Sequence, residues 1–306
     1  MAYEANIVLD SMSNASDQRL TTFEITFPRI VLAEFNTHRM FSRNSASSRA
    51  IPVAKQLRRV LDEPFIPIYW GANKSGMQAA AELSEEEQII AKKEWLRQRD
   101  YAVLGAVALS GGIQFLKDEV SQERISRLMS ECGYKDTSLP TPVHKQIANR
   151  LLEPFMWHTA IVTATDWSNF FALRANPNAQ PEIQRAAYLM RDAYSSNAPQ
   201  MLHYDEWHTP LIQPDERELS IEALKKISVG RCARVSYLTH DGVRDPSQDI
   251  KLHDQLRTSG HMSPFEHVAR PMTPGEIEDN PYSGNFTRWH QYRKDIPHEA
   301  DFSLVE

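Results

Sequence analysis

Residues 35–49 read Phe-Asn-Thr-His-Arg-Met-Phe-Ser-Arg-Asn-Ser-Ala-Ser-Ser-Arg, a polar run that follows an apolar segment. Arg39, Arg43 and Arg49 can each present a planar fork of N–H donors that matches a phosphate or the carbonyl edge of a pyrimidine. The serine hydroxyls can donate to the same oxygens. A solvated loop would have a similar composition. Composition alone therefore leaves two interpretations, a surface loop or a site for an anionic small molecule.

The order of residues within this stretch favours the second interpretation. It resembles the signature of the flavin-dependent thymidylate synthases, Arg-His-Arg, seven residues, Ser, one residue and Arg, through His38, Arg39, Ser42, Asn44, Ser47 and Arg49. The resemblance implies that His38 and Arg39 contact the flavin. Arg39, Ser47 and Arg49 are expected to contact the nucleotide. Ser47 and Arg49 are also expected to take part in catalysis.

A second resemblance lies near the middle of the chain. Residues 167–174, Trp-Ser-Asn-Phe-Phe-Ala-Leu-Arg, are similar to the Asn-Phe-x-x-Leu-Arg element of the family. This implies that Asn169 contacts flavin and that Arg174 contacts the nucleotide and takes part in catalysis. Residues 144–154 resemble the region where family members place an arginine on the nucleotide, here Arg150. Without the resemblance, a helix-surface arginine paired with Glu153 is an equally good interpretation of Arg150.

A third resemblance comes after the signature, although the family has it before. Residues 233–237, Ala-Arg-Val-Ser-Tyr, and 260–267, Gly-His-Met-Ser-Pro-Phe-Glu-His, are similar to the amino-terminal part of the family and imply flavin contacts from Ser236, His261, Ser263 and Glu266. A helix end followed by a proline turn could explain the glycine and the proline of the second string, but not the whole string. The simplest interpretation is a circular permutation, which folds tolerate when the old termini lie close together. It predicts that His267 and Thr21 are neighbours in space.

Four positions depart from the family pattern beside the expected ligands: Thr37, Ser45, Thr165 and Asn178, where the family has or tends to have Arg, Glu, Arg and His. They leave two alternatives open. One is C5 methylation or hydroxymethylation of another pyrimidine nucleotide, with dUMP or dCMP as substrate. The other is a pyrimidine-nucleotide-binding protein that has lost its flavin.

The resemblance implies methylation of dUMP to dTMP with FAD as cofactor, methylenetetrahydrofolate as carbon donor and NADPH as reductant. It also implies a homotetramer whose active sites are shared between subunits. Cys132 and Cys232 lie in no motif that suggests an activated nucleophile, so covalent cysteine chemistry has little support. A flavin can supply the hydride and relay the carbon unit, which leaves the protein to bind, orient and polarise the pyrimidine.

Composition narrows the functional class. The 306 residues can bury a substantial core, and a net charge of −6 argues against binding to a nucleic-acid polymer. Two isolated cysteines and the polar start of the chain predict a cytoplasmic protein, and no apolar run predicts a membrane span. No metal is expected, because the five-residue spacing of His203 and His208 does not place both on one helical face. That pair stays a weak alternative.

The pattern of the chain predicts an α+β fold, a mixed sheet covered by helices, similar to the thymidylate synthase complementing proteins. Strands are predicted at 5–10 and 20–27 with a turn at 11–18, and helices at 52–61, 84–115 and 181–197. We expect one domain over 1–306. Residues 65–141 have no counterpart in the resemblance and are interpreted as a helical insertion. Residues 283–297 are basic and aromatic, as in a mobile flap or a docking arm.

Overall fold

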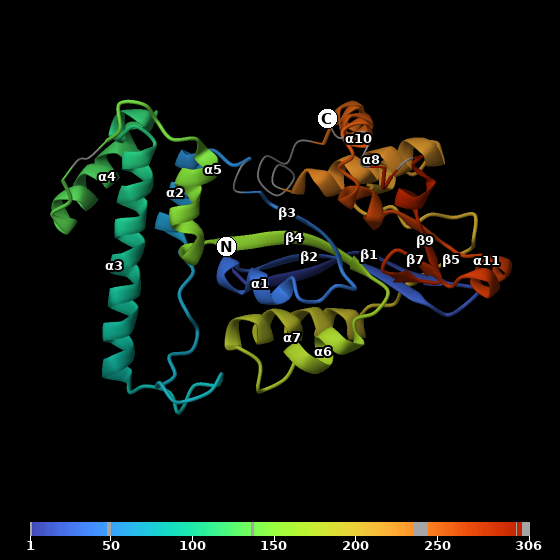
Figure 1. The fold of residues 1–306 in the computed structure, drawn as a ribbon, viewed down its shortest axis with the longest axis horizontal. Helices are drawn as coiled ribbons and strands as arrows, with labels where there is room; N and C mark the ends of the chain where they lie inside the picture. Colours follow the sequence, from blue (N-terminus) through green and yellow to red (C-terminus); the bar gives the residue numbers. More distant parts are fainter. Residues whose placement is uncertain (1, 48–49, 136–137, 236–243, 298, 302–306) are drawn as a thin grey trace.

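The computed structural model describes residues 2–47, 50–135, 138–235, 244–297 and 299–301 (Figure 1). Its centre is a five-stranded sheet in the order β3-β4-β2-β1-β5. The strands are β1 (Glu4–Ser13), β2 (Arg19–Pro28), β3 (Ser42–Ser45), β4 (Trp157–Ala164) and β5 (Gln200–Leu202). Strand β5 runs parallel to β1, and the other pairs are antiparallel. The predicted mixed sheet and the hairpin of its first two strands are confirmed.

One face of the sheet carries the larger apolar core. Alternate residues Phe23, Ile25 and Phe27 of β2 point to this face and are almost fully buried, as the period-2 pattern of a strand requires. Helices α1 (Leu32–Phe35), α6 (Ser168–Arg174) and α7 (Pro181–Ser196) cover it, and the short 3₁₀ turn η1 (Arg29–Val31) leads into α1.

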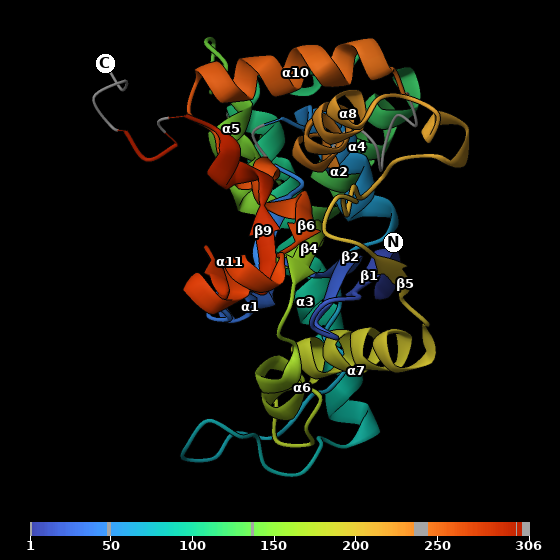
Figure 2. The ribbon, with the colours of Figure 1, turned by 90° about the vertical axis from the view of Figure 1, so that its right-hand side faces the viewer.

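The opposite face is covered by α8 (Ile221–Ala233) and α10 (Pro246–Thr258), so the sheet lies between two helical layers (Figure 2). On this face Ile161 of β4 packs against Cys232 and Val235. The 3₁₀ turn η4 (Pro214–Glu216) precedes α8. Among the described residues no helix has the length and apolar character needed to cross a membrane.

A second helical unit stands beside the sheet, built from α2 (Val53–Asp62), α3 (Glu85–Leu109), α4 (Glu119–Cys132), α5 (Lys145–Ala148) and the 3₁₀ segment η3 (Asn149–Phe155) (Figure 1). Helix α3 starts at a capping box between Ser84 and Glu87 and ends before Gly111 and Gly112. Both glycines have positive φ, +95° and +89°, which ends the helix at Leu109 and leaves 113–115 as the 3₁₀ turn η2 (Ile113–Phe115). Helices α3 and α4 lie within 65–141, and the interpretation of this segment as an insertion stays a prediction.

The C-terminal part consists of two small strand pairs and three short helical segments. The strands are β6 (Ala269–Pro271) with β9 (Trp289–Gln291) and β7 (Tyr282–Ser283) with β8 (Phe286–Thr287). The helical segments are η5 (Ser263–His267), which packs on α8, α11 (Pro274–Asp279) and η6 (Tyr292–Asp295). Phe286 and Trp289 are completely buried. The segment 283–297, predicted as a flap or docking arm, is therefore packed into the fold.

Two boundaries were wrong: the helix predicted over 84–115 ends at Leu109, and the first strand extends beyond residue 10. The polar residues that follow Asp10 predict a turn, yet Ser11 and Ser13 are buried and continue β1. Ser11 can remain in the sheet because its hydroxyl contacts Nδ1 of His208 at 2.8 Å, so burial leaves no polar atom unpaired.

Replacing Gly230 with alanine is expected to lower the free energy of unfolding by about 1–3 kcal/mol. A Cβ at this position of α8 would lie 2.4 Å from the backbone oxygen of Asp249, so α8 and α10 would have to move apart. Urea unfolding measures the loss. Gly275→Ala in α11 is the matched control, because its Cβ would meet no heavy atom within 4 Å. Equal losses in the two variants would contradict the close contact.

Candidate active site around the signature

The signature segment forms a turn and an edge strand. Phe35 ends α1, a turn follows, and β3 then pairs antiparallel with β4, with Ser42 opposite Thr163. Phe35 and Phe41 are buried and anchor the segment to the sheet. Polar side chains of the signature are thereby held along one edge of the sheet.

His38 and Arg174, predicted from two separate motifs, contact each other directly. Arg174 Nε donates to His38 Nε2 at 3.0 Å, and the same guanidinium forms an ion pair with Glu34. Because Nε2 accepts, the proton of the neutral imidazole is on Nδ1. His38 is therefore an acceptor that fixes the orientation of Arg174.

Burial, together with the positive charges of Arg174 and Arg43, lowers the pKa of His38 to about 4. The imidazole is consequently neutral near pH 7. Its ring packs edge-on against Phe170 at 4.9 Å and near Phe41, and Arg43 donates to the His38 carbonyl at 3.2 Å.

Glu266, predicted to contact the flavin, lies in η5 beside Ser42, the first residue of β3. Its Oε2 accepts from the Ser42 hydroxyl at 2.7 Å, and its Oε1 accepts from Arg293 at 2.6 Å. Asn285 donates to the Met40 carbonyl at 3.0 Å beside this pair. Both carboxylate oxygens of Glu266 are thus held by the protein itself.

Asn44 meets the third motif at the other end of β3. Its amide lies 2.9 Å from Nε2 of His267 and 3.3 Å from the Ser263 hydroxyl. With its amide nitrogen turned towards the histidine, Asn44 donates to Nε2, and His267 Nδ1 donates to the Thr163 hydroxyl at 2.7 Å. Burial lowers the pKa of His267 to about 3, so this ring is neutral.

The hydrogen-bonded chain continues across the sheet. The Thr163 hydroxyl lies 2.7 Å from that of Thr22, which lies 2.8 Å from Nε2 of His208. Burial, with His267 nearby, lowers the pKa of His208 to about 3. His208 therefore binds two hydroxyls of the sheet, and no cluster able to hold a metal ion occurs among the residues that the structure describes. Thr163 thus bridges His267 and Thr22. Thr22 is next in sequence to Thr21, the residue that the permutation predicts near His267.

The sequence also matches a known family. Residues 17–200 match the family model described as "Thymidylate synthase complementing protein". The chain belongs to the thymidylate synthase complementing protein family. It is accordingly an enzyme of the class that comprises FAD-dependent thymidylate synthases and related pyrimidine C5 methylases, and its general reaction is C5 methylation of a pyrimidine nucleotide.

Several solved structures are similar to this chain, and two of them are of one protein. Both are crystal structures of the UMP/dUMP methylase PolB from Streptomyces cacaoi, one bound with 5-Br dUMP and one with 5-Br UMP. Their sequences are 14% and 15% identical to this chain; the matches cover 65% of it and 91% and 90% of theirs, with a TM-score of 0.42 each. A search of curated proteins finds no match.

The remaining predicted residues of this family member lie mostly at the surface. Those that face solvent are Arg39, Ser47, Asn169, His261 and Ser263. Arg150 is exposed in η3 and donates to Glu153 at 2.6 Å, the pairing that its structural interpretation predicted. Its neighbour Asn149 donates to the Ile51 carbonyl, close to the end of the signature. Arg49 and Ser236 lie outside the described residues.

Sequence reasoning missed three groups in the cluster. Glu34 orients Arg174, while Asn285 and Arg293 reach β3 and Glu266 from the C-terminal part. The basic and aromatic composition of 283–297 was the one signal available, and it indicated no particular partner. Thr165, a departure from the family pattern, is buried and accepts from the Thr287 amide at 3.1 Å.

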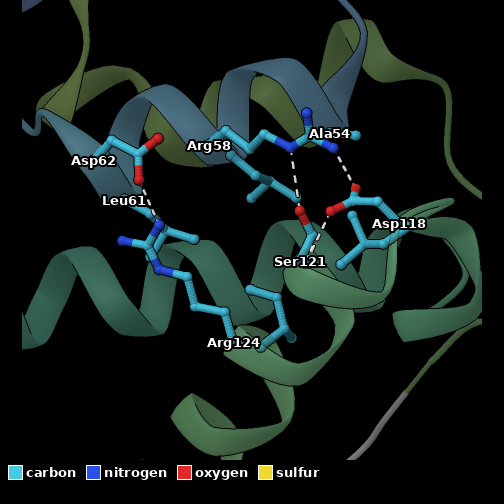
Figure 3. A pocket seen from close by; sticks show the side chains of 10 residues that line it. Ala54, Arg58, Leu61, Asp62, Asp118, Ser121 and Arg124 are labelled. Carbon is cyan, nitrogen blue, oxygen red and sulfur yellow. Dashed lines mark hydrogen bonds and ion pairs between the residues drawn. The ribbon is translucent and has the colours of Figure 1, made fainter.

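A cavity of about 310 Å³ lies between α2 and α4 and is lined by no signature residue (Figure 3). Arg58 forms an ion pair with Asp118 and donates to Ser121, and Arg124 forms an ion pair with Asp62. The rest of the lining is apolar: Ala54, Leu57, Leu61, Leu116 and Ile125. Because none of the three motifs lines this cavity, we do not place the nucleotide in it.

Proposed function

We propose that this enzyme methylates C5 of dUMP to give dTMP, with FAD as cofactor, methylenetetrahydrofolate as carbon donor and NADPH as reductant. The observation that carries the proposal is the contact between His38 and Arg174. It joins the signature to the second motif, 136 residues away in sequence, and so brings together two residues that separate motifs assign to one site.

Arg174 is suited to act on the pyrimidine. Its side chain is about one-fifth exposed, and Glu34 and His38 fix the guanidinium from two sides. A positioned cation stabilises negative charge that develops on a ring oxygen when C5 becomes nucleophilic. Arg39, Ser47 and Arg49 are proposed to hold the rest of the nucleotide, and Arg150 to contact it from η3.

A thiol nucleophile has no support in the structure. Cys232 is fully buried, and burial raises the pKa of its thiol far above the usual range. Cys132 lies in α4, where burial, with Asp100 and Glu131 nearby, also raises its pKa. Both effects disfavour the reactive thiolate.

The donor set fits a flavin. Arg39, Asn169, His261 and Ser263 are exposed donors and acceptors, suited to a pyrophosphate and to the polar edge of a flavin ring. Arg39 lies shortly before β3, and Ser263 contacts Asn44 of this strand. We propose these residues, with His38, Ser236 and Glu266, as the FAD site. A bound reduced flavin supplies the hydride and relays the carbon unit. Thr165 does not serve the adenylate side, because its hydroxyl is buried and bound to Thr287.

We also propose that the chain is circularly permuted. The family match begins at residue 17, immediately before β2, and ends at 200, before the third motif. That motif nevertheless contacts β3 and β4 through Glu266 and His267. Residues 65–141 lie within the matched range, and we propose them as a helical elaboration. The shared-site homotetramer is likewise a proposal, which light scattering can test.

The first test is flavin retention. Protein incubated with FAD and passed through gel filtration is expected to elute with a flavin absorption band. Product mass from dUMP and from dCMP, with methylenetetrahydrofolate and NADPH, then identifies the substrate. A hydroxymethyl product, or a product from dCMP alone, would favour the alternative that Thr37 and Ser45 motivate. Binding of dUMP without flavin would contradict the proposal and favour a flavin-free protein.

A further inference from the structure

The C-terminal unit, from η5 to η6 at residues 263–295, contacts the signature through a hydrogen-bond network that includes residues outside all three motifs. Ser42 of β3 contacts Asn285 and Glu266, and Glu266 accepts from Arg293. Gln291 supports this network by donating to Asn285. Residues far apart in the chain meet here: Ser42 of β3 and Asn285 are 243 residues apart in sequence.

We propose that the C-terminal unit forms a fixed wall of the active site, and that Arg293 and Asn285 are positioning residues that hold Glu266 and β3 for flavin binding. The inference rests on the function proposed above. Arg293 and Asn285 themselves belong to none of the three matched motifs.

Arg293 fixes the carboxylate of Glu266. A carboxylate with one hydrogen bond can rotate, whereas Glu266 accepts from Ser42 on one oxygen and from Arg293 on the other. Arg293 is itself held from the far side by an ion pair with Glu299. The side chains of Arg293 and Glu266 are 29% and 18% exposed, so the pair is partly shielded from solvent. Such charge-assisted bonds are stronger and more directional than neutral ones.

Asn285 fixes the strand. Its amide nitrogen donates to the Met40 carbonyl at 3.0 Å and lies 3.2 Å from the Ser42 hydroxyl, and its oxygen accepts from Gln291 at 2.8 Å. Gly284, with φ +60°, makes the turn that presents it. A Cβ at Gly284 would lie 2.3 Å from the end of the Gln291 side chain, so a larger residue here would displace the amide that donates to Asn285.

The test compares two arginine–glutamate pairs of the same unit. Arg293→Gln removes the cation that holds Glu266. Arg270→Gln removes a similar pair with Glu276, at 2.9 and 2.6 Å, which makes no hydrogen bond to the signature residues that the structure describes. We expect Arg293→Gln to raise the Kd for FAD, measured by flavin fluorescence, about tenfold, with Arg293→Lys restoring most of the affinity. Arg270→Gln should leave Kd unchanged at a similar melting temperature.

A measurement without ligand separates this inference from the proposed function. Hydrogen exchange of the peptide covering 40–46 should be faster in Arg293→Gln and Asn285→Ala than in wild type and Arg270→Gln. Equal exchange rates in all four proteins would contradict the proposal that Arg293 and Asn285 hold β3 in place. Failure of the wild type to retain FAD would overturn the proposed function instead, and the exchange result would still decide whether the unit fixes β3.

Discussion

Replacing Arg174 with glutamine is expected to lower kcat/KM for the pyrimidine nucleotide about 1,000-fold. Glutamine removes the cation that we place on the pyrimidine, and loss of one positioned donor at a developing charge costs about 100- to 1,000-fold. It also leaves Glu34 without its partner. Arg174→Lys keeps the charge but loses the planar fork, so an intermediate rate is expected. Product formation from dUMP at varied concentration measures both variants.

The control for this loss is Arg191→Gln. Arg191 is exposed on α7 and pairs with the adjacent Asp192, so its removal should leave kcat/KM within about twofold of wild type. A structural readout accompanies the kinetics: without Arg174, the pKa of His38 should rise from about 4, because one of the two cations that lower it is gone. An Arg174→Gln enzyme within about fivefold of wild type would exclude this residue from the chemistry.

Local patterns predicted much of this fold. Alternation in residues 20–27 gave a strand because a half-buried strand needs apolar side chains every second residue. The capping box at Ser84 marked where α3 begins, but the helix predicted to reach residue 115 ends at Leu109, because Gly111 and Gly112 adopt positive φ. The failure at Ser11 has a physical cause: a buried serine looks like a turn residue until its distant partner, His208, is known.

The site was predictable only where short motifs carry it. His38 and Arg174 were found through separate motifs, and their contact followed when α1 and α6 packed on the same face. Asn285 and Arg293 could not be found, because their roles depend on how a whole unit folds back onto β3. Long-range contacts of this kind have no periodicity in the sequence.

Acidification is expected to remove most of the stability between pH 6.5 and pH 4. Burial lowers the pKa of His158, His208 and His267 to about 3, from an ordinary value of 6.5, with Arg29 also acting on His158 and His267 on His208. Below pH 6.5 the unfolded chain binds protons that the folded chain does not. The free energy of unfolding therefore falls as pH falls, by about 1.4 kcal/mol per pH unit for each histidine.

Together with His38, these rings should cost roughly 5 kcal/mol between pH 6 and pH 5, a large part of the stability of an ordinary domain. Urea unfolding at several pH values measures the slope. His208→Gln should reduce it by about one proton, because a neutral amide replaces a ring that the unfolded state protonates. Ser11→Ala is the matched control: it removes a partner of His208 and lowers stability, but it keeps the histidine and so the slope. An unchanged slope in His208→Gln would mean that this histidine accepts its proton without unfolding the sheet, and that the chain from Asn44 to Ser11 tolerates a charge at its centre.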